Sequence, residues 1–158
     1  DPPGWQLTDL SCVDPDTGTT WDLGTRTATI DLDAGEDIVC TFENTEEGSI
    51  TIVKDAGDAE PTDFDFSTTG GLSPPSFTLD DDDSLGPLAS ATPDTQLFPG
   101  VLPGEYTVTE TIPVLWSLDS LVCTDPDGGS SGDTGTATAT IDLDPGEAVI
   151  CTFTNSLA

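Results

Sequence analysis

The sequence of 158 residues predicts an all-β fold, an antiparallel β-sandwich of about seven to nine strands. Three observations support this prediction. Short runs rich in β-branched and aromatic residues alternate with polar residues. Turn signals such as Pro-Gly and Pro-Asp-Gly-Gly separate these runs, and the 16 glycines and 13 prolines would interrupt long helices. A long internal repeat also divides the chain.

The clearest strand-like runs lie in the last two thirds of the chain. Five segments have the composition of strands: residues 50–54, 64–66, 76–79, 106–110 and 148–153. The turn signals follow at 103–104, 126–129 and 145–146. We expect these strands to pair into two sheets that share one core.

The repeat relates residues 5–44 to residues 116–155. The two segments align without a gap at an offset of 111 residues, and 24 of the 40 paired positions are identical. Since one period is 111 residues, we interpret residues 1–47 as the C-terminal part of a preceding β-sandwich repeat and residues 48–158 as a complete repeat. Residues 1–47 could not stand alone as half a sandwich, because its apolar face would be bare. They are completed either by residues of the same chain outside this segment or by strands from a neighbouring molecule.

Charge excludes several functions. The formal net charge is −29, with two basic residues against 31 acidic ones and no histidine. Nucleic acids and anionic membrane surfaces are bound through clustered Lys and Arg, so neither is expected as a partner. Without histidine the chain lacks the commonest general base and transition-metal ligand, so we do not expect an enzyme. No apolar stretch approaches the roughly 20 residues of a spanning helix, and no membrane span is expected in this segment.

The four cysteines follow the repeat. Cys12 and Cys40 are 28 residues apart, and so are Cys123 and Cys151. The repeat favours one disulfide within each pair, whereas a metal site would need closer ligand pairs or histidine. Structural disulfides indicate an extracellular location.

Strand alternation places three polar residues together. Lys54 is the only lysine, and Asn155 and Asn44 are the only asparagines and occupy equivalent positions of the repeat. Alternation puts Lys54, Glu110 and Asn155 on the faces of their strands that carry the apolar residues, so all three are expected in the core.

A buried lysine favours its neutral amine, which is a nucleophile. With a carboxyl group to move protons, this amine could attack the asparagine amide, expel ammonia and leave an isopeptide cross-link. The alternatives are a non-covalent ion pair of Lys54 and Glu110 with Asn155 hydrogen-bonded nearby, or an exposed lysine.

Three sequence stretches resemble a known family. Residues 48–55, 103–111 and 151–155 are similar to the prealbumin-like, Cna B-type (SpaA-like) modules of bacterial surface adhesins and pilins. The run from Tyr106 to Thr111 matches the family's Tyr-x-Leu-x-Glu-Thr box, with Val108 in place of leucine.

The resemblance implies a prealbumin-like or immunoglobulin-like sandwich, strung with others in stalks or fibres. Many members carry a Lys–Asn isopeptide bond assisted by an acidic residue. Carried over by position, these residues are Lys54, Asn155 and Glu110. Many cross-linked members lack cysteine, and the disulfides are a departure from that pattern.

Acidic runs form a second class of candidate site. Asp80, Asp81, Asp82 and Asp83 supply oxygen ligands suited to Ca²⁺, as do the loops around Asp14, Asp16, Asp125 and Asp127. No EF-hand spacing is present, and a hydrated acidic surface that keeps repeats soluble is the favoured interpretation.

The function expected from these patterns is structural. We predict a repeat module of an extracellular fibre, pilus-like filament or adhesin stalk, with disulfides and an isopeptide bond as internal staples and no catalytic residues. Its partners would be like repeats in the same chain or neighbouring subunits of a fibre. The alternative is an adhesin domain that recognises a glycan or a host protein through its loops.

Overall fold

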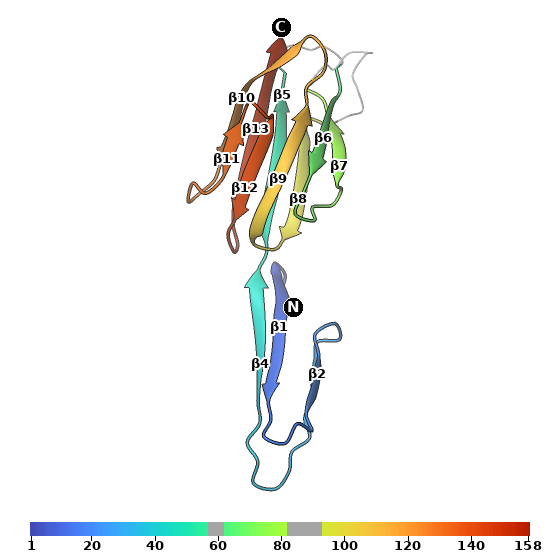
Figure 1. Cartoon of the computed structure of the whole chain (residues 1–158), viewed down its shortest axis with the longest axis vertical. Helices are drawn as coiled ribbons and strands as arrows, with labels where there is room; N and C mark the ends of the chain where they lie inside the picture. The colour runs from blue at the N-terminus through green and yellow to red at the C-terminus, as the bar shows by residue number, and fades with distance from the viewer. Residues whose placement is uncertain (57–61, 82–92) are drawn as a thin grey trace. The chain divides into compact units, whose positions relative to one another are not determined.

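The computed structural model describes residues 1–56, 62–81 and 93–158, and these residues contain strands and turns but no helix (Figure 1). The predicted all-β class is confirmed. Contacts within the chain divide it into two compact units, residues 1–47 and 48–158, which are described separately below. In the described residues no helix is available that could cross a membrane.

Residues 1–47 form two short ladders. Strand β1 (Trp5–Val13) pairs antiparallel with β4 (Val39–Glu46), and β2 (Thr20–Asp22) pairs antiparallel with β3 (Thr27–Thr29). The β1–β4 ladder contains a bulge after Leu7. Leu7 and Leu10 are buried, whereas most other large apolar side chains of this unit are exposed.

Residues 48–158 form two sheets packed face to face (Figure 1). Their strands are β5 (Gly48–Asp55), β6 (Phe64–Thr68), β7 (Ser76–Leu79), β8 (Thr95–Val101), β9 (Gly104–Thr111), β10 (Trp116–Thr124), β11 (Ser131–Asp133), β12 (Thr138–Leu143) and β13 (Ala148–Leu157). One sheet has the order β10-β13-β5-β8 and the other has the order β11-β12-β9-β6-β7. All five segments predicted as strands from the sequence lie in these strands.

One pair of strands departs from the antiparallel pattern. Strand β13 runs parallel to β5, with Val149 opposite Ile50 and Phe153 opposite Lys54. The last strand of the unit therefore lies beside the first, in the middle of its sheet. This placement brings residues about 100 positions apart in sequence into direct contact.

The core lies between the two sheets and follows from strand alternation. Every second residue of β5, β9 and β13 is buried. Aromatic rings fill the space between the sheets, with Phe66 edge-on to Phe153 and Phe64 edge-on to Trp116, each at about 5 Å between ring centroids. The apolar residues of alternate positions thus close one core, and the polar residues in the same registers are enclosed with them.

Candidate functional site: a buried lysine, asparagine and glutamate

Three strands place one polar residue each in the core of residues 48–158. Lys54 is on β5, Glu110 is on β9 in the opposite sheet, and Asn155 is on β13 beside β5. Each lies at an inward position of its alternating strand, and all three side chains are buried. Lys54 is the largest of them and is almost fully enclosed.

The three side chains contact one another directly. The Lys54 Nζ donates a hydrogen bond to the Asn155 Oδ1 at 2.9 Å. The Asn155 Nδ2 donates to the Glu110 Oε2 at 3.1 Å, and the Glu110 Oε1 lies 3.6 Å from the Lys54 Nζ. The amide of Asn155 is therefore held between an amine on its oxygen side and a carboxyl group on its nitrogen side.

The rest of the lysine pocket shields the amine from water. The Nζ also donates to the backbone carbonyl oxygens of Phe153, at 3.1 Å, and Asp55, at 3.2 Å. It lies 4.1 Å from the centroid of the Phe64 ring, which covers it from the opposite sheet. The position of the amine is thus fixed by backbone and ring together.

Burial shifts both titrating groups toward their neutral forms. Loss of hydration lowers the pKa of the Lys54 ammonium, and the nearby charge of Glu110 opposes this change. Loss of hydration likewise raises the pKa of the Glu110 carboxyl group, against the charge of Lys54. The site therefore favours a neutral amine facing an amide, with a carboxylic acid on the other side of that amide.

This arrangement supplies the parts of an acyl transfer. A neutral amine is the nucleophile, the amide carbon is the electrophile, and a carboxyl group contacts the nitrogen that would leave. In the structure the amine and the amide are in hydrogen-bond contact rather than covalently joined. The sequence analysis anticipated all three residues, and the structure brings them together.

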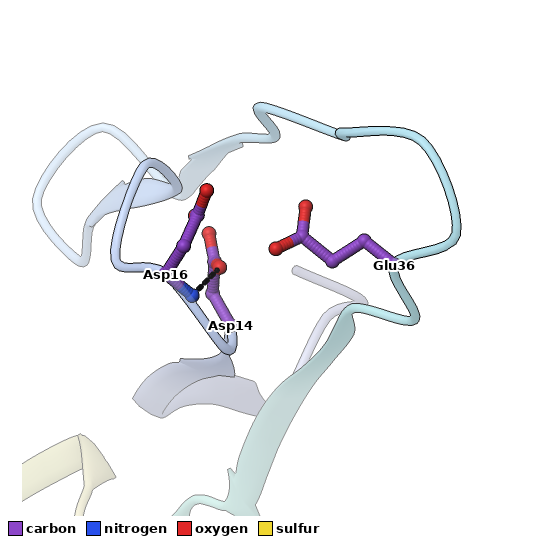
Figure 2. A group of neighbouring side chains, drawn as sticks. All are labelled: Asp14, Asp16 and Glu36. Carbon is purple, nitrogen blue, oxygen red and sulfur yellow. Dashed lines mark hydrogen bonds between the residues drawn. The ribbon is translucent and has the colours of Figure 1, made fainter.

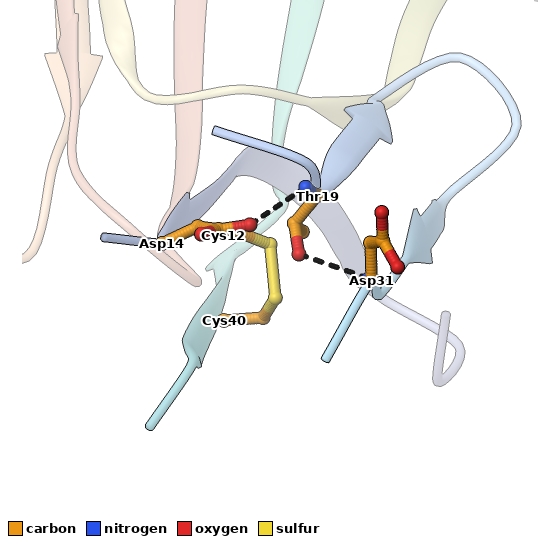
Figure 3. Close-up of a disulfide and its surroundings, with 5 residues drawn as sticks. All are labelled: Cys12, Asp14, Thr19, Asp31 and Cys40. Carbon is orange, nitrogen blue, oxygen red and sulfur yellow. Dashed lines mark hydrogen bonds between the residues drawn. A yellow bond between two sulfur atoms is a disulfide. The ribbon is translucent and has the colours of Figure 1, made fainter. Parts of the chain in front are cut away.

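Both predicted disulfides are present. Cys12 bonds to Cys40 and Cys123 bonds to Cys151, in each case between directly opposite residues of neighbouring antiparallel strands. Figure 3 shows the first bond, between β1 and β4. The second ties β13 to β10, on the side of β13 away from Lys54.

The same loop geometry accompanies each of the two disulfides. The Thr19 N–H donates to Asp14 at 2.6 Å, and the Thr19 hydroxyl accepts from the Asp31 N–H at 3.2 Å (Figure 3). In the second copy Ser130 replaces Thr19 and makes the same two contacts with Asp125 and Asp142. The loop after β1 and the loop after β10 are therefore built alike.

Two clusters of carboxylates lie at these loops. Asp14, Asp16 and Glu36 approach one another within 4.8 Å (Figure 2), and the second copy repeats this arrangement with Asp125, Asp127 and Glu147. Sequence reasoning singled out the aspartates and missed both glutamates, although the Gly-Glu pairs at 35–36 and 146–147 also recur at the repeat offset.

The contacts of Asp14 and Asp125 are made with their own loops. Asp14 accepts hydrogen bonds from the backbone of Asp16, Thr17 and Thr19, and Asp125 accepts them from the equivalent loop. The hydrogen bonds from Thr19 hold the pKa of Asp14 well below its usual range. These carboxylates organise loops, and calcium at either cluster stays a prediction.

The acidic run at 80–83 is described only in part. Asp82 and Asp83 lie outside the described residues. The Asp80 side chain is buried, and its N–H donates to the Pro93 carbonyl at 3.0 Å. The Asp81 carboxylate accepts from the Ala56 N–H at 2.7 Å. Calcium binding by this run also stays a prediction.

Comparison with known proteins identifies relatives by sequence and by fold. Residues 1–46 and 50–157 match a family described as a prealbumin-like fold domain. No curated protein sequence matches the chain. Among solved structures, an adhesin from Mobiluncus mulieris, described as containing intramolecular disulfide, isopeptide and ester bond cross-links, is 17% identical with a TM-score of 0.50. The match covers 83% of this chain and 47% of the adhesin chain, so these residues span about half the length of that protein.

A second solved structure is the major pilin from Streptococcus pyogenes. It is 14% identical, with a TM-score of 0.39, and the match covers 99% of this chain and 66% of the pilin chain. At 17% identity and a TM-score of 0.50, the property shared with the Mobiluncus mulieris adhesin is the fold.

Proposed function

Since the chain belongs to the family of prealbumin-like fold domains, we propose that residues 48–158 are a load-bearing module of a bacterial surface fibre or adhesin stalk. The module has no turnover chemistry and works outside the cell, where disulfides persist. The single observation that carries the proposal is the enclosed contact of Lys54, Asn155 and Glu110. It supports a covalent staple at the position where the module bears load.

The staple is an isopeptide bond between Lys54 and Asn155. The neutral Nζ attacks the Asn155 Cγ, and a proton passes from the attacking nitrogen through the Glu110 carboxyl group to the Nδ2. The Cγ–Nδ2 bond breaks, ammonia leaves, and an Nζ–Cγ amide bond remains. Glu110 ends the reaction as it began. No oxidant or cofactor is required, and the fold itself holds the reacting groups in place.

The parallel pairing of β5 and β13 gives this bond its mechanical effect. A force along the chain enters at the start of β5 and leaves at the end of β13, and these points lie at opposite ends of the β5–β13 ladder because the two strands are parallel. The load therefore shears the β5–β13 ladder. A bond between Lys54 and Asn155 carries that load directly from residue 54 to residue 155, so residues 55–154 are not stretched.

The disulfide has a separate role in this scheme. It joins β13 to its other neighbour, β10, and lies within the segment that the isopeptide bond relieves of load. It stabilises the fold by restricting the unfolded chain, by about 3 to 4 kcal/mol in the loop-entropy model for its separation of 28 residues. The two cross-links thus fix β13 to both of its neighbours.

Intact-mass measurement on natively folded protein tests the staple. We expect the wild-type chain to weigh less than its sequence mass by one ammonia and by the four hydrogens lost in forming the two disulfides. The variants Lys54→Met and Asn155→Ala should differ from their sequence masses by the four hydrogens alone. Asn44→Ala is the matched control, because it removes the equivalent asparagine of residues 1–47 and should leave the ammonia loss intact. Folded wild-type protein without the ammonia loss would contradict the proposal.

A second candidate function rests on one groove. An open groove of about 370 Å³ is lined by Trp21, Asp22 and the threonines at 20, 25, 27 and 29. Trp21 is exposed and has only Gly132 as its equivalent in the second copy. An exposed indole ring beside hydroxyl groups suits a sugar ring. The test is a glycan array with wild-type protein and Trp21→Ala. Binding that the variant loses would favour a glycan-binding adhesin, and an empty array would leave the structural module as the function.

A further inference from the structure

The chain contains one half of the sandwich twice and the other half once. We call residues 5–44 and 116–155 the two closing halves and residues 48–111 the opening half. The closing halves are 24 of 40 identical, whereas no second copy of the opening half occurs among the 158 residues. Within these 158 residues, two closing halves are therefore present for one opening half.

In residues 48–158 the opening half covers the inward face of the closing half. Strand β5 pairs with the edge of β13, and β9 pairs with β12. Under this cover Ile141, Leu143 and Phe153 are at most 1% exposed. The interface is a buried core closed by two backbone ladders.

The same residues are bare in residues 1–47. Ile30, Leu32 and Phe42, the equivalents of Ile141, Leu143 and Phe153, are 57%, 63% and 48% exposed. Phe42 lies on β4, which belongs to a two-stranded sheet with β1, so the edge that β13 offers to β5 has no partner strand in the described residues of this unit. An apolar face beside an open strand edge is a surface for strand addition.

The asparagine of the lysine site also has an equivalent in residues 1–47. Asn44 occupies the place of Asn155 and is exposed, so its amide is available where Asn155 meets a lysine. In residues 48–158 that lysine, Lys54, lies opposite Phe153 in the parallel β5–β13 ladder. A partner strand in the same register would therefore place its lysine opposite Phe42.

A second copy of residues 1–158 cannot be the partner without exposing another closing half. Its opening half is already paired with its own closing half, and exchange between two chains would cover one closing half by exposing another. Residues 1–158 contain two closing halves and one opening half, so copies of this segment alone leave a closing half uncovered.

We propose that residues 1–47 are a docking surface for an additional opening half, a β-segment with the chemistry of residues 48–111. Its first strand adds in parallel to the free edge of β4, with alternating β-branched residues on Ile38, Cys40 and Phe42 and a lysine that donates to Asn44. Its later strand covers Ile30 and Leu32 as β9 covers β12. Docking requires no covalent bond, so it stands independently of the isopeptide staple.

Charge predicts an unusual salt dependence for this docking. The closing half in residues 1–47 has one basic residue, Arg26, and the opening half has one, Lys54, among many acidic residues. Two acidic segments repel each other at low ionic strength, and salt screens that repulsion. Affinity should therefore rise with NaCl concentration, whereas association driven by ion pairs would weaken.

The test uses the full chain and a separate polypeptide of residues 48–111 as the probe. We expect saturable binding with one probe per chain, stronger at high than at low salt. Hydrogen exchange should slow at the amides of β4. Trp5 is 39% exposed, whereas its equivalent Trp116, which has an opening half beside it, is 9% exposed, so the fluorescence of Trp5 should shift to the blue when the probe binds.

Two variants of the full chain identify the face. Phe42→Asp puts a charge on the apolar face and should weaken probe binding by about tenfold or more. Thr41→Asp adds the same charge to the opposite face of the same strand and should change it by less than about threefold. Binding that is equally sensitive to both variants, or insensitive to both, would overturn the proposal. So would dimerisation of the full chain that Phe42→Asp abolishes, because the face would then be self-complementary.

A fusion covers the case in which the isolated probe does not stay soluble. A second copy of residues 48–115 is placed directly before Trp5 of the full chain, which reproduces the junction between Leu115 and Trp116. We expect the segment 5–44 to become as resistant to protease as 116–155. A fusion in which 5–44 is still cleaved as fast as in the parent chain would overturn the proposal.

Discussion

The two closing halves fold alike locally and differ in what surrounds them. In both, a bulge interrupts the ladder between the disulfide-bonded strands at the same position, a disulfide joins opposite residues with a Cα–Cα distance of 4.0 Å, and a Thr or Ser links two loops. Only the copy in residues 48–158 has its apolar face buried. Local geometry is therefore a property of the closing half, whereas burial is a property of the pair of halves.

This difference separates two kinds of contribution to the molecule. The hydrogen bonds at turns and the disulfides need only residues of the closing half itself. The core and the lysine site need the opening half, because Lys54 and Glu110 both belong to it. Equivalent substitutions in the two copies therefore measure what the opening half contributes.

The largest effect is expected under force. Asn155→Ala removes the staple, so pulling should unfold residues 48–158 and free about 80 residues, whose extended length is roughly 280 Å at about 3.5 Å each. Reducing the disulfide in this variant should add roughly 100 Å more for its separation of 28 residues. Wild-type protein and Asn44→Ala should show no such lengthening of this unit in single-molecule pulling. Identical force–extension traces from Asn155→Ala and Asn44→Ala would contradict this prediction.

Phenylalanine truncation should give the next largest contrast. Phe153 is fully buried and edge-on to Phe66, so Phe153→Ala should lower the free energy of unfolding of residues 48–158 by about 3 to 5 kcal/mol. Phe42→Ala should change it by less than about 0.5 kcal/mol, since Phe42 is half exposed and belongs to the other unit. Urea unfolding measures both, and a similar cost for the two would mean that Phe42 is covered in solution.

The disulfides offer a third contrast. Replacing Cys123 and Cys151 by serine should lower the free energy of unfolding of residues 48–158 by about 3 to 4 kcal/mol, because the unfolded chain regains the freedom that the closed loop denied it. Replacing Cys12 and Cys40 should leave that transition unchanged. Thermal unfolding followed by the fluorescence of Trp116 would record this. A shift of that transition when Cys12 and Cys40 are replaced would reveal coupling between the units.

The smallest effect concerns pH. In Lys54→Met no staple can form, and Glu110 keeps its raised pKa because it is still buried. The stability that a raised carboxyl pKa gives is complete below the unfolded value of 4.5 and is lost as pH rises through the folded pKa. Relative to Lys54→Met/Glu110→Gln, the single variant should lose up to about 1.4 kcal/mol per pH unit in that range.

Urea unfolding at several pH values between 4 and 8 measures this slope. Lys54→Met/Glu43→Gln is the control, because Glu43 is exposed on β4 and its loss should leave the profile of Lys54→Met unchanged. Parallel profiles for Lys54→Met and Lys54→Met/Glu110→Gln would contradict the burial of Glu110 as a titrating group.

Sequence patterns were sufficient where the information is local. Alternation in β5, β9 and β13 placed Lys54, Glu110 and Asn155 on inward faces, and the repeat paired the cysteines. The pattern missed β8, which contains Pro99 and Gly100 and reads as a turn. A strand can hold proline there because β8 lies at the edge of its sheet, which only the sheet order reveals.

By itself, the sequence determined the all-β class, the disulfide pairs and the inward direction of the three polar side chains, because strand period and repeat offset are properties of the chain order. Only the tertiary structure decided that β13 lies parallel to β5, and hence that Lys54 contacts Asn155 about 100 residues away. The same is true of burial: identical residues are bare in one copy and enclosed in the other. Pairing between distant strands depends on the surface that each strand can cover, and no local pattern carries that information.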